Sequence, residues 1–132
     1  MIAIRIVKVK KGQALVEFAI ILPILLLLVM GIFEFGMLLN SYLTIQNVSR
    51  EGARLGIVGG TDIEINNLIN QISPNLTPTD LIVSVTPIET SRHSGDTLTV
   101  NVTYNYHMTV PIISALLSNL VALKAQTSMR IE

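Results

Sequence analysis

Residues 10–36 read KKGQALVEFAIILPILLLLVMGIFEFG, and this stretch decides the fold of the chain. No charged side chain interrupts the apolar run that begins at Phe18 until Glu34 is reached. A helix of about 20 residues crosses the hydrocarbon core of a bilayer, so residues 13–39 are long enough to form a transmembrane helix. Residues 40–132 are then expected to form a domain outside the cytoplasm.

The charges around this helix predict its orientation. Residues 1–12 contain four basic residues and no acid, namely Arg5, Lys8, Lys10 and Lys11. Basic residues that flank a transmembrane segment stay on the cytoplasmic side of the membrane. We therefore expect a single-pass protein with its N-terminus in the cytoplasm and its C-terminal domain outside.

The remaining composition excludes several classes of function. Without residues 1–12, the chain would keep five basic and nine acidic side chains, a formal net charge of −4. No basic stripe for nucleic acid is then left. The chain has no cysteine, which excludes a disulfide framework and a thiolate metal site. We expect no nucleic-acid partner, no cofactor and no metal.

The helix is expected to continue beyond the membrane. Apolar residues recur at helical spacing after residue 36, and Gly59-Gly60 is expected to end the helix. A helix over residues 13–57 would be about 65 Å long, roughly half in lipid and half in water. Pro23 removes one backbone hydrogen bond and is expected to bend the helix.

The second half of the chain changes from helical to strand periodicity. Thr61 and Glu64 have capping-box spacing, which predicts a second helix. Apolar and polar residues then alternate in three segments, 81–86, 97–108 and 121–131, which predicts three strands. The predicted fold class is α+β: a long N-terminal transmembrane helix, a second helix and a three-stranded antiparallel sheet whose apolar face packs on the outer half of the long helix.

Candidate catalytic residues are few. His93 lies near Asp96 in an expected turn, and His107 lies on the polar side of a strand. Neither histidine has the spacing of a metal-binding motif, and no serine elbow or glycine-rich phosphate loop accompanies them. We predict no catalytic residue and no enzymatic activity, and we rank an exported hydrolase that uses His93 or Asp96 last.

A glycine separates the basic leader from the apolar helix, and an acid follows it. Gly12 leaves no side chain in the way of a membrane-embedded peptidase. Cleavage after Gly12 would expose an ammonium group on Gln13, four residues before Glu17 and on the same helix face. Such a pair would explain a carboxylate at the edge of hydrocarbon. The alternative is an interfacial glutamate that extends to the lipid headgroups beside a signal anchor.

This junction has the spacing of a class III prepilin signal, and a longer stretch resembles the TadE-like family of pseudopilins from tight-adherence (Tad/Flp) pilus systems. The matching features are Gly12-Gln13-Ala14, Glu17-Phe18, Leu22-Pro23, residues 31–36 and residues 49–54. The resemblance implies cleavage after Gly12 by a prepilin peptidase, with Gln13, Glu17 and Phe18 as the other processing residues.

The resemblance also implies a biological setting. It implies a minor pilin-like subunit that acts in pilus assembly, adhesion or export. The implied location is the cell (inner) membrane of a bacterium or archaeon, or the pilus itself. The implied partners are the membrane, the prepilin peptidase, other pilin-like subunits and Tad assembly proteins. The alternative function is a signal-anchored extracytoplasmic binding module, in which Asn105 and His107 would be essential and Glu17 could be replaced freely.

Glu34 is a second acid in the apolar stretch. It either contacts a partner helix of the pilus machinery or marks the outer boundary of the membrane. It lies about 25 Å along a helix from Glu17, a spacing that favours the boundary.

Overall fold

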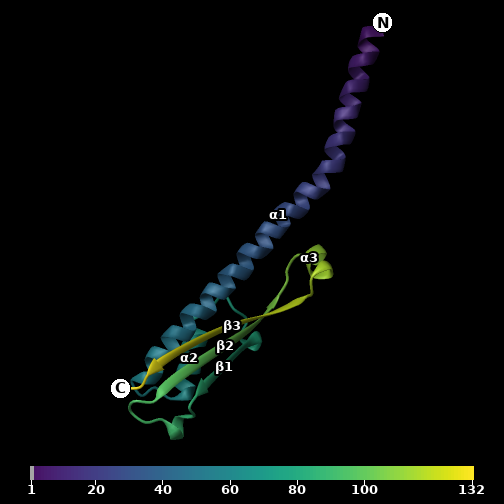
Figure 1. Cartoon of the computed structure of the whole chain (residues 1–132). Helices are drawn as coiled ribbons and strands as arrows, with labels where there is room; N and C mark the ends of the chain where they lie inside the picture. Colours follow the sequence, from purple (N-terminus) through teal and green to yellow (C-terminus); the bar gives the residue numbers. More distant parts are fainter. Residues whose placement is uncertain (1) are drawn as a thin grey trace.

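The computed structural model describes residues 2–132, with side chains described from Lys10 onward. One helix, α1 (Ile2–Ile57), projects as a long rod from a small domain (Figure 1). The predicted beginning of the helix near Gln13 is wrong. A single internal glycine costs a helix only about 1 kcal/mol relative to alanine, so the helix continues through Gly12 into the leader. Helix α1 bends in its N-terminal half, the part that contains Pro23 (Figure 1).

The C-terminal end of α1 is set by two glycines, as predicted. Gly59 has a φ of +96°, a left-handed conformation that glycine adopts without a Cβ clash. The Gly60 amide donates a hydrogen bond of 3.0 Å to the Leu55 carbonyl. This is the 6→1 bond of a Schellman motif, which satisfies a carbonyl at the helix end.

The rest of the chain forms a second helix and a three-stranded sheet, so the predicted α+β class is confirmed. The elements are α2 (Asp62–Ile72), η1 (Pro78–Asp80), β1 (Leu81–Thr86), η2 (Glu89–Ser91), β2 (Thr97–His107), α3 (Pro111–Leu116) and β3 (Leu120–Arg130). The strands are antiparallel in the order β1-β2-β3, and Val102 in the central strand pairs with Val83 and Ala125. The two short 3₁₀ turns were not predicted.

The capping box at the start of α2 is also confirmed. The Thr61 hydroxyl accepts a hydrogen bond of 3.2 Å from the Glu64 amide, and the Glu64 carboxylate accepts one of 2.9 Å from the Thr61 amide. These two bonds satisfy amide groups that the first turn of a helix leaves free.

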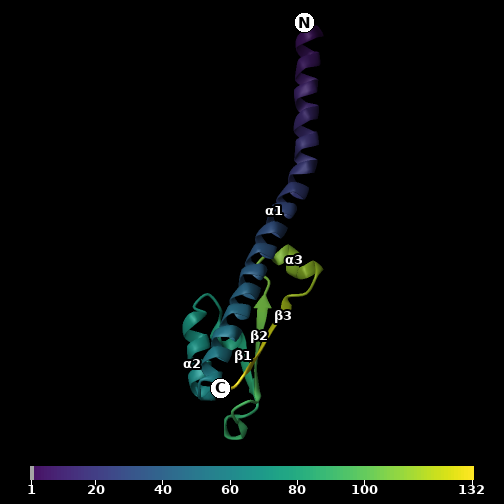
Figure 2. The ribbon, with the colours of Figure 1, turned by 60° about the vertical axis from the view of Figure 1, so that its left-hand side comes forward.

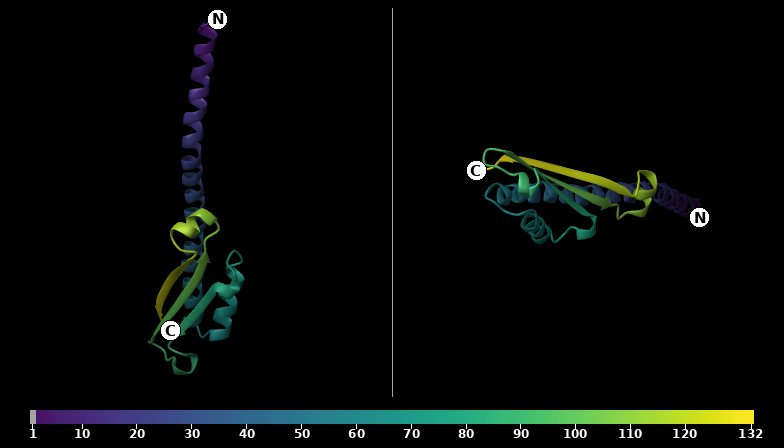
Figure 3. Two further views of the ribbon diagram at one scale, coloured as in Figure 1. Left: turned by 90° about the vertical axis from the view of Figure 1, so that its right-hand side faces the viewer. Right: turned by 90° about the horizontal axis from the view of Figure 1, so that it is seen from below.

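The hydrophobic core lies between the sheet and the C-terminal half of α1. Helix α1 packs against β2 and β3, and α2 packs against α1 (Figures 2 and 3). Fully buried apolar side chains come from each of these layers, including Ile45, Val48, Ile65, Ile69, Leu98 and Val100. The sheet therefore covers the outer half of the long helix, as its alternating pattern predicts.

Small residues on α1 allow this close packing. Four buried positions of α1 form what we call the small-residue face: Ser49, Gly52, Ala53 and Gly56. A Cβ atom built on Gly56 would lie 2.3 Å from Leu98, and one on Gly52 would lie 3.0 Å from Ile69. The charged residues between them, including Arg50 and Arg54, are exposed. Within residues 49–54, the small side chains therefore pack against the domain and the charged side chains face solvent.

Candidate functional site

The predicted processing junction lies near the N-terminal end of α1. Gly12, Gln13, Glu17 and Phe18 are all exposed. The Gln13 side-chain amide donates a hydrogen bond of 3.2 Å to the Glu17 carboxylate, so the helix brings positions 13 and 17 to one face. A Cβ atom built on Gly12 would meet no neighbouring atom within 4 Å. The surroundings of this glycine are therefore open to an approaching protein.

The second acid of the apolar stretch has a different environment. Glu34 is 3 % exposed and accepts hydrogen bonds from three donors that are distant in the sequence. The Tyr106 hydroxyl donates at 2.8 Å and the Val110 amide at 2.8 Å, and the Thr109 amide donates to both carboxylate oxygens at 3.0 and 3.2 Å. We call these four residues the Glu34 cluster. It connects the middle of α1 to the chain between β2 and α3.

The Glu34 cluster also changes the acidity of its tyrosine. Burial, together with the hydrogen bond to the Glu34 carboxylate, raises the pKa of Tyr106 to about 12. Both causes favour the neutral phenol, because an anion would be poorly solvated and would face a second anion. Tyr106 is therefore a stable hydrogen-bond donor at physiological pH.

The hydrogen-bond partners of Glu34 were not predicted from the sequence. A contact between Glu34 and a partner helix stays a prediction. The structure shows three hydrogen-bond donors to Glu34 from the same chain. Two signals for them existed: Tyr106 lies on the apolar face of the predicted strand, and Thr109 and Val110 directly precede Pro111, outside the strand pattern. These residues are far from Glu34 in the sequence, so local patterns did not predict their hydrogen bonds to it.

Comparison with known protein families gives a match to the part of α1 that contains Glu17 and Glu34. Residues 12–54 match the family model described as TadE-like protein. This segment is TadE-like. The resemblance seen in the sequence is thereby confirmed, over about a third of the chain. No curated protein and no solved structure matches the chain.

The TadE-like segment begins at Gly12 and ends at Arg54, so it contains the processing junction, Glu34 and most of the small-residue face. The match fits a pilin-like subunit related to Tad pili. Helix α1 is also long and apolar enough to cross a membrane, with a window of mean hydropathy 2.8 that is not buried. Both findings fit a location at the membrane.

The two histidines lie outside the TadE-like segment. His93 is exposed in a turn, where its amide donates a hydrogen bond of 3.0 Å to the Asp96 carboxylate. The ring of His107 lies 3.2 Å from the Asp80 carboxylate at the surface. Among the residues that the structure describes, no three histidine, cysteine, aspartate or glutamate side chains form a group that could hold a metal ion.

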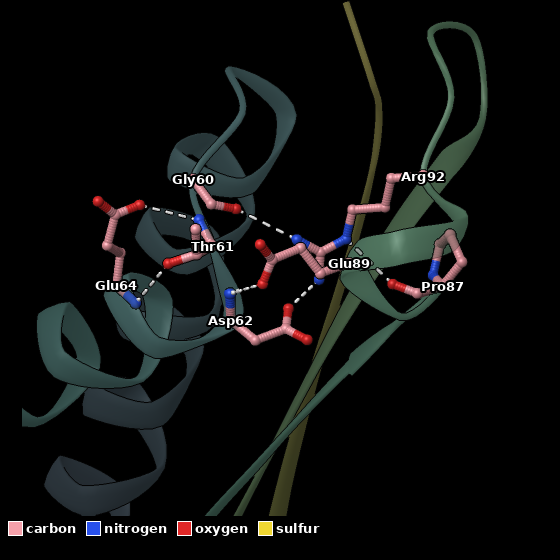
Figure 4. A network of polar contacts seen from close by, with 7 residues as sticks. All are labelled: Gly60, Thr61, Asp62, Glu64, Pro87, Glu89 and Arg92. Atoms are coloured by element: carbon pink, nitrogen blue, oxygen red, sulfur yellow. Dashed lines mark hydrogen bonds and ion pairs between the residues drawn. The ribbon is translucent and has the colours of Figure 1, made fainter.

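An arginine that the sequence did not single out connects two turns of the domain (Figure 4). The side chain of Arg92, which is 9 % exposed, donates hydrogen bonds to the Gly60 carbonyl at 3.1 Å and to the Pro87 carbonyl at 3.0 Å, and forms an ion pair with Asp62. The Asp62 amide in turn donates a hydrogen bond of 3.3 Å to Glu89. Arg92 therefore joins the α1–α2 turn to the β1–β2 turn, far from Glu34.

Proposed function

We propose that this chain is a minor pilin-like, TadE-like subunit of a tight-adherence pilus or secretion system. A prepilin peptidase removes residues 1–12 by cleavage after Gly12, and the mature subunit acts in pilus assembly, adhesion or export. The observation that carries the proposal is the open, exposed Gly12 followed by Glu17 on the face of Gln13, at the start of the TadE-like match.

The position of Gly12 inside α1 supports its role in processing. The peptide bond after Gly12 lies within a continuous helix, so a peptidase has to unwind that turn before it can reach the bond. Glycine lowers the cost of unwinding because it destabilises a helix interior by about 1 kcal/mol relative to alanine. The four basic residues of the leader keep the bond on the cytoplasmic side of the membrane.

Glu17 is the proposed recognition acid of the mature subunit. Cleavage replaces the Gly12–Gln13 peptide group with an ammonium on Gln13, one helical turn from the Glu17 carboxylate. That carboxylate pairs with the ammonium of its own chain or of a neighbouring subunit in an assembled bundle. In hydrocarbon such a pair is favoured because an unpaired charge there costs a few kcal/mol.

Mass spectrometry of the protein from its native host tests this proposal. The expected mature chain begins at Gln13 when the prepilin peptidase is active and at Met1 when that peptidase is deleted. Gly12→Ala should block processing. The matched control is Gly36→Ala, which changes another open glycine of α1 and should be processed normally. A chain that still begins at Met1 in a host with a working peptidase would refute the proposal.

A second function, the signal-anchored binding module, is favoured by one observation. A groove of about 340 Å³ lies between α1 and the end of β2, and its lining includes Asp80, Tyr104 and His107. Under this alternative, His107→Ala abolishes function while Glu17→Ala is neutral. The pilin-like function predicts the reverse, so the two variants compared in one pilus-assembly or adhesion assay separate the alternatives.

A further inference from the structure

The connection between β2 and β3 is unusually apolar for an exposed segment. No charged residue occurs between His107 and Lys124. Four apolar side chains in this connection and at the first residue of β3 are about half exposed or more: Ile112 at 50 %, Leu116 at 71 %, Leu117 at 72 % and Leu120 at 47 %. Helix α3 contributes no buried residue to the core of the domain. Its apolar surface therefore serves something other than the fold of the domain.

The position of α3 points to its environment. The connection extends past the end of the sheet toward the N-terminal half of α1, and α3 lies beside α1 in every view (Figures 1, 2 and 3). A Cβ atom built on Gly31 would lie 4.0 Å from the Ile113 side chain. Glu34 accepts hydrogen bonds from Thr109 and Val110. Both Gly31 and Glu34 belong to residues 13–39, the segment proposed to cross the membrane.

The exposed surface of α1 at the level of Glu34 is apolar as well. Ile32, Phe33 and Phe35 are each more than 60 % exposed, and they lie on either side of Glu34 in the sequence. The exposed leucines of this connection therefore lie at the same level along α1 as side chains that face lipid if α1 spans the membrane. This shared level identifies the lipid bilayer as the environment of these leucines.

We propose that the segment from Thr109 to Leu120 inserts into the outer leaflet of the membrane beside α1, with the Glu34 cluster as its attachment. This inference rests on the proposed membrane insertion of α1. Free backbone amides are costly in hydrocarbon, and the Glu34 carboxylate satisfies those of Thr109 and Val110. In return, these donors and Tyr106 satisfy a carboxylate that would otherwise be unpaired at the same depth. The carboxylate and its donors therefore lower each other's free-energy cost of entering lipid.

Insertion would fix the domain relative to the membrane. A single transmembrane helix leaves a domain free to tilt and rotate, whereas a second apolar contact beside it restricts both motions. The sheet would then be held at one height above the bilayer, with the groove near His107 close to the lipid surface.

Fluorescence quenching of the full-length protein in vesicles tests the inference. The chain has no cysteine, so single-cysteine variants can be labelled with bimane. A label at Leu117→Cys reports on the environment of α3, and a label at Leu27→Cys reports on the membrane-spanning part of α1. Ile63→Cys replaces a 73 % exposed side chain at the start of α2, and its label is the reference for a position in water. The vesicles contain phosphatidylethanolamine and phosphatidylglycerol, with nitroxide-labelled acyl chains as the lipid quencher and iodide as the aqueous quencher.

The expected result is that the label at position 117 behaves like that at position 27. Lipid nitroxides should quench it several-fold more than the label at position 63, and iodide should quench it several-fold less. Iodide quenching at 117 equal to that at 63, with 27 still in lipid, would overturn the inference and leave the proposed function intact. Protection of 117 from both quenchers would also overturn it, because the surface would then contact a second protein. A label at 27 that lipid nitroxides do not quench would refute the membrane insertion of α1 itself.

Discussion

The Tyr106 hydroxyl donates a hydrogen bond of 2.8 Å to the carboxylate of Glu34, a residue 72 positions earlier in the chain. This bond joins the central strand of the sheet to the middle of α1. The same carboxylate accepts hydrogen bonds from two backbone amides at the start of the α3 segment. One acid therefore determines where the domain meets the proposed membrane segment.

Replacement of Glu34 should destabilise the domain. Glu34→Ala leaves the Tyr106 hydroxyl and the amides of Thr109 and Val110 without an acceptor, and an unsatisfied buried donor costs about 1–3 kcal/mol. We expect a loss of about 2–4 kcal/mol in the free energy of unfolding, measured by urea unfolding in detergent micelles with near-UV circular dichroism. Glu51→Ala is the control, because Glu51 is half exposed in the same helix and its ion pair with Arg54 is at the surface. Equal stability of the two variants would contradict the role of the cluster.

Stability should also depend on alkaline pH through Tyr106. Its pKa is raised to about 12 in the folded chain, against about 10 in an unfolded chain. The folded state therefore holds the phenolic proton more tightly. This contribution, on the order of 2–3 kcal/mol, is complete below about pH 10 and is lost as the pH rises through about 12.

The measurement is urea unfolding of the native protein and of Tyr106→Phe across this pH range. The difference between their free energies of unfolding should shrink as the pH rises from about 10 to about 12. The other basic and phenolic groups titrate in both proteins, so they cancel in the difference. A difference that stays constant would show that the phenol is not held in this way.

The small-residue face predicts a steric effect of one methyl group. Gly56→Ala places a Cβ atom 2.3 Å from Leu98, which is fully buried. Overpacking of this kind costs about 1–3 kcal/mol. Gly36→Ala adds the same methyl group to α1 in open space and should cause no loss. Urea unfolding of both variants in micelles checks the prediction, and a stable Gly56→Ala protein would show that α1 and β2 can separate without cost.

Arg92 should be essential for the junction of the two turns. Arg92→Ala removes the donors of the Gly60 and Pro87 carbonyls and the cation paired with Asp62. We expect a loss of about 2–3 kcal/mol in the free energy of unfolding, because two part-buried carbonyls lose hydrogen bonds from a charged donor. Arg92→Lys should recover only part of it, since an ammonium cannot reproduce the planar fork of the guanidinium. Arg54→Ala is the control, because that side chain is 69 % exposed and its loss should be within about 0.5 kcal/mol.

Local patterns predicted most of the elements of the fold. The apolar run of residues 18–33 and the glycines at 59 and 60 predicted the long helix and its end. The Thr61–Glu64 capping box predicted α2, and strict alternation predicted three strands whose ends differ from the structure by at most about two residues, as end assignments commonly do. These features depend on neighbours within a few positions, so the order of residues alone determines them. The start of α1 was missed because a single glycine is too weak to end a helix.

Local patterns in the chain therefore specify a long apolar helix, an α+β domain and the spacing of Gly12 and Glu17 on that helix. Three contacts depend on long-range packing: Glu34 is enclosed by Tyr106, Thr109 and Val110, Arg92 joins two turns, and Gly56 lies against Leu98. Each of these contacts joins residues about 30 to 76 positions apart. They form only when the sheet packs on the helix, because side chains that are far apart in the sequence reach hydrogen-bond or van der Waals distance only after burial of the apolar faces brings their backbones together.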